Sequence, residues 1–445
     1  MKKMLILGLL PLLMPSAISA LTINEALVHV INTNPEIHER IENHKAIEKD
    51  KTIAFADYLV VVDIQGGVGK KRYNGTIPGF DDDEWTHTEA FIRARENIFH
   101  GFGTESNVEQ QDKRLESAKH YLMEKVSQLG LDMIEKYLSI LKTKKLLKLA
   151  VENRDKHNEY YNKIKQNTES GAGTSADMAQ ISGRLALAES NVWVAKNNLL
   201  DAQTNFYRIY GEMVTPSDLT EPKIDSNFIP KTLKEAEQLA LDDYPSILTM
   251  KKNVEALKAK YKQTKENYYP WVDLELKQNY YNNNNSGTLA GLDFAREVSQ
   301  TTLMLIATWN LYNGGADVAL REKAAIRMFE ESDRMLNTVR LVKERLELSW
   351  AAKERLAEQV KYLKQHRDYT KKTVADYNEE FGLGRRTLLD LLDVENEFYT
   401  SRKAYVTGLY DEKLAKFRLI ENVGNLPKMV SVTPEDILQI ERIAR

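Results

Sequence analysis

Apolar residues recur along this chain at two different spacings, and each spacing predicts a different kind of element. Near the start, apolar side chains recur every three or four residues, which predicts an amphipathic helix. Thr22 precedes this stretch and Glu25 follows three residues later, a pairing that caps helix N-termini. The apolar stripe consists of Ala26, Leu27, Val30 and Ile31.

Four later stretches have an apolar residue at every second position, which predicts β-strands. In one of them, Val272, Leu274 and Leu276 alternate with acidic and basic side chains. Loops are expected between the strands of each pair, at 71–84 and 282–297, and the second loop is rich in Asn and Gly, as exposed turns are. The strands are expected at about 58–70, 85–98, 271–281 and 298–311.

Two long stretches, residues 104–168 and 316–380, contain neither Pro nor Gly, apart from Gly130. Leu, Ala and Val alternate there with charged residues at spacings of three and four, which is typical of coiled-coil neighbours. Each stretch has 65 residues, and a helix of that length measures roughly 100 Å. After a short turn, a shorter helix is expected to return at 174–210 and at 387–423. The turn glycines are Gly171, Gly173, Gly382 and Gly384.

This succession of elements occurs twice, with short sequence matches at equivalent places. The opening Thr22-Ile-Asn-Glu-Ala recurs 210 residues later as Thr232-Leu-Lys-Glu-Ala. Asn97-Ile-Phe-His-Gly recurs 213 residues later as Asn310-Leu-Tyr-Asn-Gly, and the first hairpin turn recurs at the same offset. The expected division is a first repeat at 21–215, a linker at 216–230, a second repeat at 231–426 and a tail at 427–445.

Composition narrows the cellular location. Lys2 and Lys3, an apolar run and small residues predict a secretory signal peptide over residues 1–20, and no later apolar run reaches the ~20 residues of a spanning helix. The absence of cysteine excludes disulfides, thiolate metal sites and a catalytic thiol. Without the signal, 60 basic and 65 acidic residues give a formal charge of −5, which does not favour nucleic acid. The periplasm, the outer membrane or the exterior is therefore the expected destination.

Four strands cannot close a barrel by themselves, so two arrangements of the sheet are open. One is a soluble sheet with one wet face, and the other is a membrane barrel shared between subunits. Strands of about ten residues with one polar face suit tilted spanning strands around water. Aromatic residues also flank the third strand, as an interfacial girdle would, and these features favour the barrel. They are Tyr268, Tyr269, Trp271, Tyr280 and Tyr281.

The sequence resembles the TolC family of outer-membrane channel proteins over nearly all of the mature chain. The resemblance rests on the duplication, the repeated Thr-x-x-Glu-Ala openings, the strand-ending Asn-Leu-Tyr-Asn-Gly-Gly and the motif Gly-Arg-Arg-Thr-Leu-Leu-Asp-Leu-Leu-Asp. It implies an α+β membrane protein, a homotrimer whose protomers each give four strands to one twelve-stranded barrel. A helical α-barrel continues across the periplasm, where an adaptor (membrane fusion) protein and an inner-membrane transporter dock. Catalysis and cofactors are not expected.

The motif ends in two aspartates whose roles differ. Asp390 follows a threonine by three residues, as Asp177 does in the first repeat, and this spacing predicts helix capping. Asp393 lies one turn further into the helix, where capping does not require it, and its equivalent in the first repeat is Gln180. A plain surface carboxylate and a functional role both remain open for Asp393.

The resemblance implies a role for this motif at the periplasmic entrance of the channel. Asp390 and Asp393 match two aspartates that form constricting acidic rings in TolC-like channels. Arg386 matches an arginine that latches the entrance shut by binding an acid of the first hairpin, here Asp177. A tyrosine that assists this latch is replaced by Phe381, which has no hydroxyl. The expected entrance is therefore acidic, with a latch that lacks one bond.

The sequence also bears on functions other than a channel. Residues 66–70 resemble a phosphate-binding loop, but Ile64 and Lys71 stand where that motif needs Gly and Ser or Thr, so an enzyme is not expected. A divalent ion between Asp390 and Asp393 is left open. A soluble periplasmic coiled-coil scaffold is the alternative to a channel. Within the channels, the motif looks most like those of type I protein secretion, and multidrug efflux is the alternative.

Overall fold

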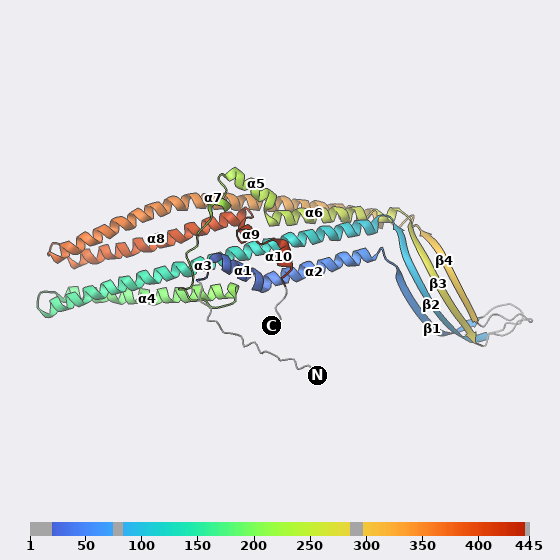
Figure 1. Ribbon diagram of the computed structural model, residues 1–445, viewed down its shortest axis with the longest axis horizontal. Coiled ribbons are helices and arrows are strands. Elements are labelled where there is room, and N and C mark those ends of the chain that lie inside the picture. The colour runs from blue at the N-terminus through green and yellow to red at the C-terminus, as the bar shows by residue number, and fades with distance from the viewer. Residues whose placement is uncertain (1–19, 74–82, 285–296, 441–445) are drawn as a thin grey trace, which may run out of the picture. The chain divides into compact units, whose positions relative to one another are not determined.

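The computed structural model describes residues 20–73, 83–284 and 297–440, so the predicted signal peptide, apart from Ala20, lies outside the described residues (Figure 1). Among the described helices, none is both long enough and apolar enough to cross a membrane. In chain order the elements are α1 (Ile23–Thr33), α2 (Pro35–Ala56), β1 (Val61–Tyr73), β2 (Asp83–His100), α3 (Gly103–Glu169), α4 (Ser175–Tyr210), η1 (Ser226–Phe228), α5 (Leu233–Asp243), α6 (Pro245–Gln263), η2 (Glu266–Tyr268), β3 (Trp271–Asn284), β4 (Glu297–Thr308), α7 (Ala316–Gly382), α8 (Leu388–Asn422), α9 (Leu426–Met429) and α10 (Pro434–Leu438).

Each repeat opens with a pair of helices separated by a proline. The predicted capping box at the start of α1 is confirmed, with Thr22 N donating to Glu25 Oε2 at 2.8 Å. Asn34 then ends α1 in an extended conformation, because the residue before a proline is kept out of the helical region. Tyr244 ends α5 in the same way before Pro245 begins α6.

The four strands form an antiparallel sheet in the order β1-β2-β3-β4. The register pairs Ile64 with Ile92, and it pairs Leu276 with Leu303, so apolar residues share one face. On the other face, Arg93 Nη2 lies 2.7 Å from Asp63 Oδ2 across the β1–β2 pair. The alternation in the sequence therefore separates an apolar face from a polar one, as predicted.

The ends of the strands differ from the predicted ranges. β1 begins at Val61 instead of residue 58, and β4 ends at Thr308 instead of residue 311. β1 and β3 continue beyond their predicted ends, to Tyr73 and Asn284. Backbone pairing continues there because it does not require the alternation of side chains. The remainder of the two predicted loops, residues 74–82 and 285–296, lies outside the described residues.

The chain forms two compact units, and each unit draws on both sequence repeats. The first comprises Met1–Ile41, Leu122–Pro245 and Arg340–Arg445. Its largest buried side chains include Tyr137, Phe206 and Phe417. The Tyr137 hydroxyl lies 2.7 Å from the carbonyl oxygen of Thr220 and 2.8 Å from that of Leu21. The beginning of the first repeat and the linker are thus fixed to the same core.

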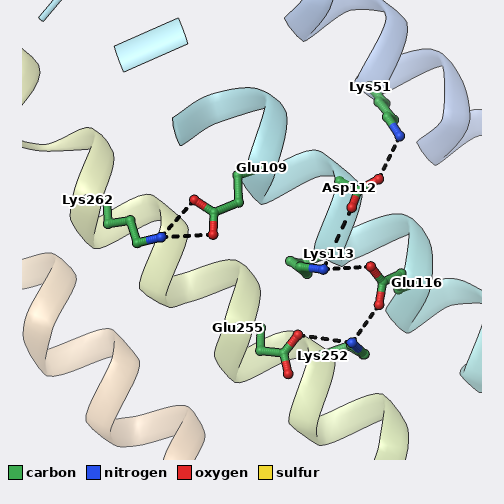
Figure 2. A network of polar contacts seen from close by, with 8 residues as sticks. All are labelled: Lys51, Glu109, Asp112, Lys113, Glu116, Lys252, Glu255 and Lys262. Carbon is green, nitrogen blue, oxygen red and sulfur yellow. Dashed lines mark hydrogen bonds and ion pairs between the residues drawn. The ribbon is translucent and has the colours of Figure 1, made fainter. Parts of the chain in front are cut away.

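The second unit, Glu42–Tyr121 and Ser246–Val339, contains the sheet and a network of ion pairs between α2, α3 and α6 (Figure 2). Glu116 is its centre, with Lys113 Nζ at 2.7 Å and Lys252 Nζ at 2.5 Å. Burial would raise the pKa of Glu116, but the hydrogen bonds from the two lysines outweigh it and lower this pKa to about 2. The network contains Lys51, Glu109, Asp112, Lys113, Glu116, Lys252, Glu255 and Lys262.

Candidate functional site

The two helical hairpins of the first unit end in turns of the same construction. In the first turn, Ala172 N donates to Asn167 O at 2.8 Å and Gly171 N donates to Thr168 O at 3.1 Å. The second turn has the same two bonds, from Arg385 N to Glu380 O at 2.8 Å and from Gly384 N to Phe381 O at 3.0 Å. This is the Schellman pattern, which needs a left-handed residue after the helix. Gly171 and Gly384 supply it, with φ of 79° and 71°.

Capping chemistry follows each turn, as the sequence predicted for both aspartates. Asp390 N donates to Thr387 Oγ1 at 3.2 Å, and the Thr387 hydroxyl donates to Asp390 Oδ2 at 2.8 Å. Asp177 and Thr174 make the same pair of bonds, at 3.1 and 2.7 Å. The side-chain and backbone hydrogen bonds from Thr387 hold the pKa of the Asp390 carboxyl below its usual value. Asp390 is therefore a partly exposed carboxylate whose ionised form is favoured in the protomer.

Arg386 binds an acid of its own hairpin. Its Nε lies 2.6 Å from Glu380 Oε2, and its guanidinium lies over the Tyr377 ring, 4.1 Å from the centroid. Asp177, the predicted partner, is instead bound to its capping threonine. Within the protomer, Arg386 thus pairs across the second turn, and its latch with Asp177 stays a prediction. The second turn places Arg386 beside the end of α7, within reach of Glu380.

Asp393 is joined to the first hairpin. Arg184 Nη2 of α4 lies 2.7 Å from Asp393 Oδ1 of α8. Phe381, which stands at the position of the assisting tyrosine, packs against the buried cluster beneath the turns, and Lys163 Nζ lies 5.3 Å from its ring centroid. Phe381 therefore contributes packing and a cation–π contact where a tyrosine would also offer a hydroxyl.

An apolar cluster supports both hairpin ends. Within it, the Tyr160 hydroxyl of α3 lies 2.7 Å from Glu395 Oε1 of α8 and 3.0 Å from Asn378 Oδ1 of α7. These contacts fix α3 against α7 and α8, so the charged residues at the ends project from a packed base. The buried members are Tyr160, Ile164, Ile181, Leu388, Leu391 and Leu392.

The comparisons with known proteins agree with this architecture. The sequence model described as "Outer membrane efflux protein" matches the chain twice, over residues 26–212 and 237–425. These two matches cover most of the sequence.

The chain belongs to the outer membrane efflux protein family.

Two curated relatives are 21% identical to this family member. One is the outer membrane efflux protein BepC of Brucella suis, aligned over 91% of this chain and 86% of the relative. The other is the alkaline protease secretion protein AprF of Pseudomonas aeruginosa, aligned over 74% of this chain and 66% of the relative. The crystal structure of the CmeC outer membrane channel of Campylobacter jejuni has the same fold, with a TM-score of 0.79, 12% identity and coverage of 95% and 90% of the two chains.

Family membership confirms several expectations from the sequence. The protein is a TolC-like channel of the outer membrane with a periplasmic helical part, and it is not an enzyme. The fold class is confirmed as well, with four strands joined to long helices. The alternative of a soluble scaffold is not supported.

The predicted aromatic girdle divides between two sites in this family member. Tyr269 and Trp271 lie where β3 begins, and Trp271 contacts His100 edge-on at 4.1 Å between ring centroids. Tyr280 and Tyr281 lie within β3, since the strand continues to Asn284. Adjacent strand residues point to opposite faces, and Tyr281 stacks with His87 at 5.9 Å. Tyr280 shares the apolar face with Leu274 and Leu276, whereas Trp271, at the other end of β3, points to the same face as Tyr281. The aromatic girdle therefore stays a prediction.

Sequence reasoning missed the partners of the motif. Arg184, Glu380 and Tyr377 are bound to the predicted residues but were not singled out. Two features of the sequence pointed to these partners. Glu380 precedes Arg386 by only six residues across the turn, and Arg184 lies two turns into α4. In the described part of the chain, no three His, Cys, Asp or Glu side chains gather as a metal site would require.

Proposed function

We propose that this protein is the outer-membrane exit duct of a tripartite system, and that Asp390 and Asp393 form its periplasmic mouth. The observation that supports this is the position of two carboxylates one turn apart at the start of α8, directly after the second hairpin turn, where Asp393 is exposed and Asp390 is partly exposed. Repeating the protomer around an axis would gather them into rings. Rings of carboxylates favour the passage of cations.

Planar lipid bilayers test both parts of this proposal. Wild-type protein is expected to give cation-selective conductance, and Asp390→Ala/Asp393→Ala is expected to lower the K⁺/Cl⁻ permeability ratio several-fold. Asp201→Ala is the matched control, because it removes an exposed carboxylate of α4 far along the helix from its turn. An unchanged ratio in the double variant contradicts the acidic mouth, and the absence of wild-type conductance contradicts the duct.

A homotrimer is the assembly that we propose for the duct. The outer edges of β1 and β4 have no strand partner among the described residues, and three such sheets would close a barrel of twelve strands. Exposed apolar residues also recur at a spacing of seven on α4 and, with one interruption at Arg355, on α7, as at a helix–helix interface. They are Trp193, Leu200 and Tyr207 on α4 and Leu341, Leu348, Tyr362 and Tyr369 on α7.

The oligomeric state is measurable by native mass spectrometry. Wild type is expected to have three times the mass of the protomer, and Leu200→Glu is expected to reduce the trimer because it places a charge in the α4 stripe. Asn198→Glu, which adds the same charge at an exposed position on the other side of the same helix, serves as the control. A wild-type monomer, or a Leu200→Glu variant that assembles normally, is inconsistent with this interface.

The hairpin ends are the proposed docking point for the adaptor and the inner-membrane transporter. Leu383 in the second turn and Leu389 at the start of α8 are exposed apolar side chains. A helical partner that covered them would gain by removing them from water. Leu383→Asp should abolish co-purification of the cross-linked adaptor. Ser170→Asp at the equivalent position of the first hairpin should not, and equal loss in both variants argues against a site at Leu383.

Protein export through type I secretion is the cargo class that we propose. The sequence motif at the entrance favours it, and the relative AprF is named for the secretion of alkaline protease. BepC is named for efflux, so drug export is the second candidate. A gene deletion distinguishes the two. Loss of large secreted proteins with drug susceptibilities within twofold of wild type supports protein export, and the opposite result supports efflux.

A further inference from the structure

The two repeats contain equivalent joints between an opening helix and the last turn of the returning helix. In the first repeat, Asn34 at the end of α1 donates its amide Nδ2 to the carbonyl oxygen of Ile209 at the end of α4, at 3.0 Å. In the second repeat, Tyr244 at the end of α5 donates its hydroxyl to Glu421 Oε1 at the end of α8, at 3.1 Å. Asn34 and Tyr244 occupy the same place, directly before the proline of each repeat.

The joints differ in one chemical respect, because only the second contains a titratable group. The amide–carbonyl bond of the first repeat has no ionisable member. Glu421 is a carboxyl group that is only 5% exposed, and Tyr244 is 3% exposed. Buried carboxylates are ordinarily paired with a cation. Among the described residues, Glu421 has no ion pair, and its hydrogen-bond partner is the neutral Tyr244.

The groups that face Glu421 come from three packed elements. Glu124 projects from α3 and Arg345 from α7, and both act on the carboxyl through space, while Tyr244 touches it from the end of α5. On α8 itself, Arg418 is occupied by Glu135 at 3.2 Å. Burial has the largest effect on the pKa of Glu421 and raises it. The hydrogen bond from Tyr244 and the charge of Arg345 lower this pKa, and the charge of Glu124 raises it. The resulting pKa is about 7.

A second arrangement is available to the ionised carboxylate. A groove of about 750 Å³ lies beside the joint, and Tyr244, Arg345 and Glu421 all line it. The Arg345 side chain is exposed there, so a charged Glu421 could leave Tyr244 and turn toward water and the guanidinium. Packing behind the joint is close, since a Cβ on Gly424 would lie 3.0 Å from the carbonyl oxygen of Asp243. Movement of the Glu421 side chain is therefore directed toward the groove.

We propose that the Tyr244–Glu421 joint is a proton-controlled conformational switch that the first repeat lacks. Protonated Glu421 stays buried against Tyr244 and holds α5 to the end of α8. Loss of the proton favours the arrangement in which the Glu421 side chain turns into the groove. This loosens α5 and the last turn of α8, while the Asn34 joint between α1 and α4 is unaffected. This inference concerns the fold of each protomer, so it stands independently of the proposed cargo and acidic mouth.

Hydrogen–deuterium exchange of the full-length protein in lipid nanodiscs tests the switch. Exchange is measured at pH 5.5 and 8.0, corrected for the intrinsic chemical rate, in peptides from α5 and the end of α8. When the joint opens, the pKa of the Glu421 carboxyl is expected to fall from about 7 to 4.5. Thermodynamic linkage then predicts that the equilibrium constant for opening rises about 25-fold between pH 5.5 and pH 8.0. Peptides from α1 and the end of α4 report the first joint and are expected to change by less than about twofold.

Two variants make the result specific. Glu421→Gln keeps the size and the hydrogen bonding of the side chain but cannot ionise, so the pH dependence of the α5 peptides should disappear. If this variant does not fold, Tyr244→Phe retains the carboxyl, removes the bond that lowers its pKa and should move the transition to higher pH. The proposal is overturned if Glu421→Gln keeps the wild-type pH dependence, if both joints respond equally, or if Tyr244→Phe leaves the transition where it was.

Discussion

Arg184 of α4 and Asp393 of α8 form an ion pair that joins the two hairpins of one protomer, with 2.7 Å between Nη2 and Oδ1. The residues are 209 positions apart in the sequence. The Asp393 side chain is 59% exposed, so the pair stabilises the fold by only about 0.2–1 kcal/mol. Its main effect is to orient a carboxylate and to neutralise its charge at the proposed mouth.

Removal of Arg184 should therefore make the mouth more acidic without unfolding the protein. Arg184→Gln is expected to raise the K⁺/Cl⁻ permeability ratio in bilayers about twofold at 0.1 M salt, with little change at 1 M, because salt screens exposed charges. Lys156→Gln is the control, since Lys156 of α3 pairs with Glu159 of that same helix and not with the other hairpin. A ratio that falls or stays constant would mean that Asp393 does not face the ion path.

The ion pair between Arg386 and Glu380 predicts that Glu380 is the acid that acts with Arg386 in channel opening. Arg386→Gln and Glu380→Gln should have similar effects on channel opening, and the double variant should add little to either, because the two residues act as one pair. Asp177→Asn should leave conductance near that of wild type. The opposite pattern, with Asp177→Asn matching Arg386→Gln, would place the working latch between hairpins of different protomers.

The two glycines of the second turn should respond in opposite directions to alanine. Gly384 has a φ of 71°, so Gly384→Ala is expected to destabilise the protein by about 1 kcal/mol and to lower the unfolding midpoint. Gly382 is the last residue of α7, and Gly382→Ala is expected to stabilise it by up to about 1 kcal/mol. Thermal unfolding followed by circular dichroism measures both. Equal shifts would contradict the assigned turn geometry.

The network around Glu116 should make the protein sensitive to acid. The pKa of Glu116 is about 2 in the fold and near 4.5 when unfolded, so its stabilising effect is present above pH 4.5 and is lost as the pH falls toward 2. The side chain is 37% exposed, and solvent screening limits the effect to about 1 kcal/mol. Glu116→Gln should weaken the fall in unfolding midpoint between pH 6 and 3, whereas Glu358→Gln, which removes an exposed pair, should not. Identical profiles for wild type and Glu116→Gln would exclude this contribution.

Local features of the fold were predictable from the sequence because their interactions span only a few residues. The capping pairs of Thr22 with Glu25 and of Thr387 with Asp390 form as the spacing indicated. The long helices and the turn glycines followed from the absence and the placement of Gly and Pro. The strand ends were less predictable, because β1 and β3 continue by backbone pairing beyond the alternation of their side chains.

Contacts between distant segments were beyond the sequence pattern. An exposed aspartate such as Asp393 has many possible partners, and packing of α4 beside α8 selects Arg184. The pattern likewise gave no reason to single out Glu421, because a glutamate in an amphipathic helix is ordinarily a surface residue. Its burial against Tyr244 depends on how α5 meets the end of α8.

The sequence by itself determined the duplicated order of helices and strands, the helix caps and turns, and the family, because each depends on neighbouring residues or on a repeated motif. Only the tertiary structure decided which charges meet. Within the protomer it paired Arg386 with Glu380, joined Asp393 to Arg184, and buried one titratable carboxyl in the second repeat where the first has an amide. The physical reason is that these pairings are selected by side-chain packing between helices, which local periodicity does not encode.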